Sequence, residues 1–129
     1  MSKMLAEGFC LRYNQRMQIV RKILTLDELK QMAADTFGNM VKAVIDVDRE
    51  LIAVDAELHS DLEALLLEDG SKQKNIWGIN FYPEIQSDDF LEFDSMINMR
   101  PSQGNRSRGI ENEEIRKKII KIAAERIKR

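Results

Sequence analysis

Three arginines and two glycines lie close together in one short stretch of the chain, residues 100–109. A guanidinium group is planar and offers paired donors that suit a phosphate or a carboxylate. Gly104 and Gly109 let the backbone turn and approach a ligand, and the backbone amides around them would form a concave anion nest. The sequence therefore predicts an anion-binding loop with these candidate residues: Arg100, Gln103, Asn105, Arg106, Ser107 and Arg108.

A structural interpretation of the same loop stays open. The arginines could pair with acids of the chain itself, for which Glu84, Glu92 and Asp94 are the candidates. The loop lacks the Gly-Lys-Ser/Thr sequence of a P-loop, and glutamates crowd the start of the following helix. Because those carboxylates would repel an anion at the helix N-terminus, we expect a site of guanidinium groups and backbone amides rather than one based on the helix dipole.

The charge of the chain is unevenly distributed. Residues 100–129 carry 10 Lys/Arg and 4 Asp/Glu, a local charge of +6, whereas the rest carries 10 Lys/Arg and 18 Asp/Glu, a charge of −8. A basic C-terminal part could meet a polyanion such as nucleic acid. Alternatively, the two parts attract each other within one fold.

His59, the only histidine, lies next to Ser60 and Asp61. Its imidazole could act as a general base, whereas Ser60 is interpreted as a helix cap rather than a nucleophile. A hydrolase is therefore an alternative function. In it, the arginines orient an anionic substrate while His59, Asp94 or Glu84 moves protons. This hypothesis requires these groups to lie in one pocket.

Four acids lie near a predicted hairpin: Asp46, Asp48, Asp55 and Glu57. Carboxylates of this kind can hold Mg²⁺ or do acid–base work. Because polar and apolar residues alternate in a half-exposed sheet, we instead expect them on a solvated outer face. One histidine and one cysteine, Cys10, provide no zinc cluster, so we expect no metal and no cofactor.

The composition is that of one folded domain. The chain has 129 residues, of which 43% are hydrophobic and 33% are charged. Residues 1–16 show no clear period and are interpreted as a flexible or extension segment, followed by one domain at 17–129. No stretch predicts a membrane span or a secretory signal, so we expect a cytoplasmic protein.

The periodicity predicts five strands and three helices in the order β-α-β-β-α-β-β-α. This order indicates an α+β domain with a mostly antiparallel sheet and helices packed on one face. Capping boxes begin the first two helices at Thr25 and Ser60, and Asn112 caps the third. A two-residue turn at Arg49 and Glu50 would close the hairpin and place Ile45 opposite Val54. The expected strands are about 17–24, 40–48, 51–58, 76–82 and 90–99, and the helices are about 26–36, 61–69 and from 113 onward.

Four segments carry a resemblance to a known family. They are residues 41–50 (VKAVIDVDRE), 57–71 (ELHSDLEALLLEDGS), 76–83 (IWGINFYP) and 99–109 (MRPSQGNRSRG). From about Met17 onward the chain resembles an uncharacterised family of small prokaryotic proteins, a domain of unknown function. The resemblance implies a shared fold and carries over no catalytic residue.

The function that these observations favour is a small cytoplasmic binding protein. Its ligand would be a phosphate-containing anion, a nucleotide or a nucleic-acid backbone, held by the arginine loop. The alternatives are the hydrolase described above and a protein-interaction module that pairs with another protein. An interaction module requires an exposed apolar patch or strand edge.

Overall fold

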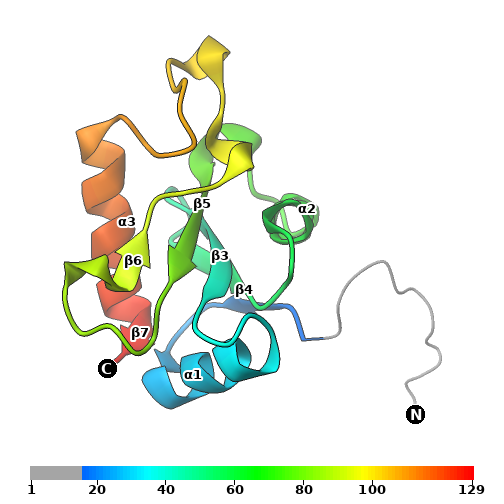
Figure 1. Cartoon of the computed structure of the whole chain (residues 1–129). Coiled ribbons are helices and arrows are strands. Elements are labelled where there is room, and N and C mark those ends of the chain that lie inside the picture. The colour runs from blue at the N-terminus through cyan, green and yellow to red at the C-terminus, as the bar shows by residue number, and fades with distance from the viewer. Residues whose placement is uncertain (1–15) are drawn as a thin grey trace.

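The computed structural model describes residues 16–129 of the chain, so the predicted segment 1–16 lies almost wholly outside the described residues. The described part is an α+β domain built on an antiparallel five-stranded sheet (Figure 1). The strand order in this sheet is β1-β4-β3-β5-β6, and a separate parallel pair joins β2 to β7. The strands are β1 (Gln18–Val20), β2 (Leu24–Thr25), β3 (Val41–Asp46), β4 (Leu51–Val54), β5 (Ile76–Phe81), β6 (Leu91–Glu92) and β7 (Ile127–Lys128).

Three helices complete the domain, which confirms the predicted fold class and element order. They lie on both faces of the sheet, whereas we expected them on one face. Figure 1 shows α2 and α3 on opposite sides of the strands, with α1 below them. The helices are α1 (Leu26–Asp35), α2 (His59–Glu68) and α3 (Glu113–Arg126).

The sheet lies between two helical layers, α1 with α3 on one face and α2 on the other, and an apolar cluster fills each interface. On one face Ala43 and Ile45 pack with residues of α1 and α3, including Leu29 and Ile119. On the other face Val44 packs with residues of α2 in a second cluster. The central strands therefore bury both faces, as their continuous apolar runs require, and one helical layer could not cover them.

The hairpin of β3 and β4 has a longer turn than predicted. Ile45 lies opposite Ile52, and Ala43 lies opposite Val54. The register thus differs by two residues from the predicted one. The paired side chains stay on their predicted faces because the side-chain period of a strand is two. Ala56, beyond the end of β4, packs on the opposite face from the predicted one.

Asp46 is the cause of this turn, and its predicted solvated position is wrong. Its side chain is fully buried, and Oδ1 accepts hydrogen bonds from the backbone N–H groups of Asp48 and Arg49 at 2.9 and 3.0 Å. Ser71 Oγ donates to Oδ2 at 2.5 Å. A buried carboxylate with these partners holds the four-residue turn, which ends at Glu50 with a φ of 57°.

One of the two predicted capping boxes is present, and the other is absent. Thr25 and Glu28 form the predicted box at α1, and Asn112 accepts from Ile115 N at the start of α3. At α2, however, the helix already begins at His59, after Leu58, with no side-chain cap. Ser60 is therefore inside the helix and does not cap it.

The predicted strand at 90–99 is mostly irregular. Only Leu91–Glu92 forms β6, and a 3₁₀ turn, η3 (Met96–Asn98), follows. The Asn98 side chain takes over the pairing with β5: its Oδ1 accepts from Gly78 N, and its Nδ2 donates to Gly78 O. A Cβ at position 78 would lie 2.5 Å from Ser95 Cβ, so the segment approaches β5 closely only because that residue is glycine.

Among the described residues, no helix combines the length and apolar character that crossing a membrane requires. The same residues contain no group of three or more acids, histidines or cysteines arranged to hold a metal ion.

Candidate functional site

Arg100, the first residue of the predicted site, is buried, and backbone groups of the protein itself accept its hydrogen bonds. Its side chain donates to three backbone carbonyls, those of Ile97 at 2.9 Å, Gln73 at 2.8 Å and Ile76 at 2.5 Å. The guanidinium also stacks over Trp77, 4.6 Å from the ring centroid. Burial lowers the pKa of Arg100. Three of its five N–H donors bind carbonyls, and Nη2 also lies 4.0 Å from Glu63 Oε2, so this buried arginine ties the loop to the end of β5.

Asn105 closes the loop from inside. Its Nδ2 donates to the carbonyls of Asn98, Ser107 and Gly109 at 2.7, 3.1 and 2.8 Å. Its Oδ1 accepts from the backbone N–H of Glu111 at 2.8 Å. The side chain is buried, so it fixes the loop backbone and has no capacity left for a ligand.

The predicted anion nest exists, but an acid of the chain fills it. The backbone N–H groups of Arg106 and Ser107 both donate to Glu111 Oε2, at 2.9 and 3.0 Å. These backbone hydrogen bonds lower the pKa of Glu111. The structural interpretation concerned the arginine side chains and named Glu84, Glu92 and Asp94, whereas Glu111 binds the backbone amides. Arg106 itself is exposed, and Gln103 makes one long hydrogen bond, to Lys74 O at 3.5 Å.

Arg108 is the one predicted site residue that reaches a polar pocket on the α2 face of the sheet. Its Nε donates to Asp94 Oδ1 at 2.7 Å, and this hydrogen bond raises the pKa of Arg108. No residue in the described part of the chain accepts a hydrogen bond from its terminal nitrogens. The pocket has a volume of about 400 Å³ and is called the polar pocket below. It is lined by Met40, Lys42, Leu58, His59, Ser60, Asn80, Tyr82, Glu92, Asp94, Ser95, Met96, Ile97 and Arg108.

Three adjacent strands supply the floor of the polar pocket. Lys42 on β3 pairs with Asn80 on β5, and Asn80 pairs with Glu92 on β6, so the three form a row across the sheet. Asn80 Nδ2 and Tyr82 Oη both donate to Glu92 Oε1, at 2.9 and 2.8 Å. Burial and the neighbouring Glu92 raise the pKa of Tyr82.

Asn80 has an unsatisfied oxygen. The residue is 4% exposed, and its Oδ1 accepts no hydrogen bond from the described part of the chain. A buried acceptor without a donor costs about 1–3 kcal/mol. Such a group is uncommon in folded proteins and here lies in the lining of a pocket.

His59 is held as a neutral base. Its Nε2 lies 2.8 Å from the carbonyl oxygen of Ile79. Since a carbonyl only accepts, Nε2 carries the hydrogen and Nδ1 keeps its lone pair. Burial lowers the pKa of His59, and the charge of Lys42 lowers it further. The hydrogen bond to Ile79 O, the charge of Asp94 and the neighbouring Asn80 side chain oppose the shift. The imidazole therefore lies within the electrostatic reach of both a cation and an acid of the pocket.

The N-terminus of α2 forms one wall of the polar pocket. Because Leu58 provides no side-chain cap, the backbone N–H groups of His59 and Ser60 have no intrahelical acceptor. A helix N-terminus carries roughly half a positive charge, which favours negatively charged groups. The backbone N–H groups of this wall therefore add hydrogen-bond donors to the pocket that Lys42 also lines.

The pocket brings together some sequence candidates and separates others. His59, Asp94 and Arg108 line it together, as the hydrolase hypothesis requires, whereas Glu84 pairs with Lys30 in an exposed ion pair at 3.7 Å. Sequence reasoning did not identify four site residues. These residues are Lys42, Asn80, Tyr82 and Glu92. Polar residues within otherwise apolar strands were the sequence feature that could have indicated them.

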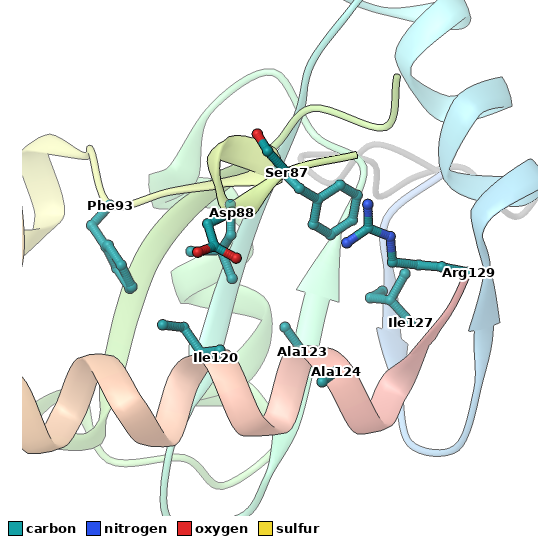
Figure 2. A pocket seen from close by; sticks show the side chains of 10 residues that line it. Ser87, Asp88, Phe93, Ile120, Ala123, Ala124, Ile127 and Arg129 are labelled. Carbon is teal, nitrogen blue, oxygen red and sulfur yellow. The ribbon is translucent and has the colours of Figure 1, made fainter. Parts of the chain in front are cut away.

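An apolar groove lies on the other face, between α3 and residues 87–93 (Figure 2). Its volume is about 570 Å³, and Ile120 in its lining is exposed. Figure 2 shows Arg129 at one end of the groove. The central carbon of its guanidinium lies 4.2 Å from the ring centroid of Phe90. The lining also contains Asp88 but is otherwise mainly apolar, so the groove is suited to contact rather than to polar chemistry.

The comparison with known proteins gives a family and no function. The model of the family described as "Protein of unknown function (DUF5674)" matches residues 18–126. No curated protein and no solved structure matches the chain.

Proposed function

We propose that the chain, which belongs to this family of proteins of unknown function, binds a small phosphate-containing anion in the polar pocket. The observation that carries the proposal is a set of cationic and N–H-bearing residues at one place. Lys42, Arg108 and the first residues of α2 all line the same 400 Å³ space. The Lys42 ammonium also lies 5.2 Å from the ring centroid of Phe37. Charged donors and helix amides are the groups that proteins use to hold phosphate.

This proposal moves the site away from most of the predicted loop. Arg100, Asn105 and the amides of the nest are occupied by the chain, so only Arg108 contributes strongly, while Arg106 adds exposed positive charge nearby. The size of the pocket matches a small molecule, since ligand pockets usually measure about 300–1,000 Å³.

Titration calorimetry with ethyl phosphate tests the proposal. Arg108→Ala should weaken binding about tenfold, because it removes a charge-assisted donor. Arg106→Ala is the matched control, since it removes an arginine of the same loop that does not line the pocket. The proposal fails if ethyl phosphate does not bind, or if both substitutions reduce affinity equally.

A nucleotide is a phosphate-containing ligand of the same kind, whereas a nucleic-acid backbone would use the wider basic surface. Oligonucleotide titrations at two salt concentrations separate the two cases. Affinity that rises with oligonucleotide length and falls steeply with salt would indicate many phosphate contacts. Affinity that depends on a single terminal phosphate would indicate the pocket alone.

The hydrolase is a second candidate, and its support is the position of His59. The imidazole is neutral, keeps Nδ1 as an acceptor and lies in one pocket with Asp94 and Arg108. In this version His59 removes a proton from an attacking water while Arg108 orients an anionic substrate. A survey of phosphate and carboxylate esters with wild type and His59→Gln tests it. Turnover that His59→Gln does not reduce would exclude His59 as the base.

The interaction module has one supporting feature, the apolar groove with exposed Ile120. Sedimentation of wild type and Ile120→Glu tests self-association through this surface. If both proteins are monomers, self-association through the apolar groove is excluded.

A further inference from the structure

The polar pocket has a positive end and a negative end. Lys42 lies on β3 and Glu92 lies on β6, on either side of β5, so their Cα atoms are roughly 10 Å apart from the strand spacing. The α2 N-terminus lies at the Lys42 end because α2 packs against β3 and β4. Asp94 follows β6 and lies at the Glu92 end.

The negative end holds more acceptors than the protein's own donors satisfy. Glu92 accepts two hydrogen bonds at Oε1, and Asp94 accepts one from Arg108 at Oδ1. The second oxygen of each carboxylate takes no hydrogen bond from the described residues. Between the two ends lies Asn80 Oδ1, which is buried and also takes none.

A simple phosphate would match only the positive end. The two acids offset Lys42 and Arg108 in formal charge, and their free oxygens would repel a second anion. A ligand that also carries a cation or several N–H donors would satisfy the free carboxylate oxygens. Matching both ends therefore requires opposite charges within one small molecule.

We propose that the polar pocket takes a zwitterionic ligand, an amine-bearing phosphate ester. Its phosphate lies at Lys42, the α2 N-terminus and the terminal nitrogens of Arg108. Its ammonium lies at Glu92 and at the Asp94 oxygen that Arg108 does not bind. This inference rests on the proposed function, since it names the class of the phosphate compound bound at that site.

Three probes with shared parts test the inference: O-phosphoethanolamine, ethyl phosphate and ethanolamine. Titration calorimetry at pH 7.5 should give O-phosphoethanolamine at least a tenfold higher affinity than either of the others. Glu92→Gln should abolish most of this preference and leave the affinity for ethyl phosphate unchanged or higher. The glutamine carbonyl can still accept from Asn80 and Tyr82, so the fold should persist, which circular dichroism checks. Glu84→Gln, an exposed acid outside the pocket, is the control and should keep the full preference.

Each result decides between the two proposals. Equal affinities for O-phosphoethanolamine and ethyl phosphate would overturn the zwitterion and leave phosphate binding in place. Equal affinities for O-phosphoethanolamine and ethanolamine would overturn phosphate binding, and with it the zwitterion. Binding of none of the three would overturn both. A preference that survives Glu92→Gln would show that the ammonium lies elsewhere, which overturns the assignment to this pocket.

Discussion

The arginine loop and the polar pocket contain similar residues and differ in how their polar atoms are used. In the loop, Arg100 and Asn105 end on carbonyls of the chain, and Glu111 fills the amide nest. In the pocket, Asn80 Oδ1 accepts no hydrogen bond from the described residues, and the uncapped N–H groups of α2 have no intrahelical acceptor. A polar cluster is thus structural when its hydrogen bonds are complete and a candidate site when they are not.

This difference predicts two kinds of variant. Substitutions in the loop should lower the free energy of unfolding, because they leave buried carbonyls unpaired. Substitutions in the pocket should leave folding nearly unchanged and alter binding.

Arg100→Ala should cause the largest loss of stability, about 3 kcal/mol or more in the free energy of unfolding. It removes three hydrogen bonds to carbonyls and the stacking on Trp77. Urea denaturation followed by tryptophan fluorescence measures it. Arg106→Ala, an exposed arginine of the same loop, should stay close to wild type. Similar stabilities for the two variants would contradict a structural role for Arg100.

Asn105→Ala should lower the free energy of unfolding by about 2–3 kcal/mol, because several buried backbone groups lose their partner at once. The same denaturation experiment measures it. Gln103→Ala is the control, since that side chain makes one 3.5 Å hydrogen bond at the surface. If Asn105→Ala matched its control, the loop would not depend on this side chain.

His59 should make stability depend on pH, with a smaller effect than either loop substitution. Burial holds its pKa in the folded protein below the ordinary 6.5, so the unfolded chain binds the proton more readily. Its contribution to stability is therefore complete above about pH 6.5 and is lost as the pH falls through that value toward the folded pKa.

The measurement for His59 is the unfolding free energy at several pH values between 8 and 5. His59→Gln can keep the donor to Ile79 O but does not titrate, so its loss of stability on acidification should be less steep than that of wild type. Parallel curves for the two proteins would show that His59 does not titrate differently on folding.

Arg108→Ala should have the smallest effect on folding, with a thermal midpoint close to wild type. Its hydrogen bond to Asp94 joins two largely exposed side chains, and such pairs contribute little to stability. Differential scanning calorimetry measures the midpoint. A large drop would place Arg108 with the structural loop residues and would weaken its assignment to the pocket.

The parts of the fold that the sequence predicted correctly depend on local patterns. The capping box of Thr25 and Glu28 spans three residues, and the apolar runs of β3 and β5 mark buried strands. These signals identified the elements and their order. They did not determine which face a helix would cover, because strands buried on both sides look the same from either face.

The errors arose where distant residues decide the outcome. His59 bonds to the carbonyl of Ile79, and Arg100 bonds to carbonyls 24 and 27 positions earlier in the chain. Ser60 resembled a cap from its neighbours alone, and Arg100 resembled a ligand-binding residue for the same reason. The site was predicted in part, through His59, Asp94 and Arg108, whereas the row of Lys42, Asn80 and Glu92 required the register of three strands.

The parallel pair of β2 and β7 has a consequence for how the chain acquires its structure. Leu24 lies opposite Ile127, and Arg126 donates to Arg21 O at 2.7 Å, so the beginning and end of the domain meet across about a hundred residues. Contacts of such long sequence separation slow folding, since a large loop must close before they form. During synthesis, β2 and the neighbouring α1 must therefore wait until residues 126–128 have emerged from the ribosome before their packing is complete.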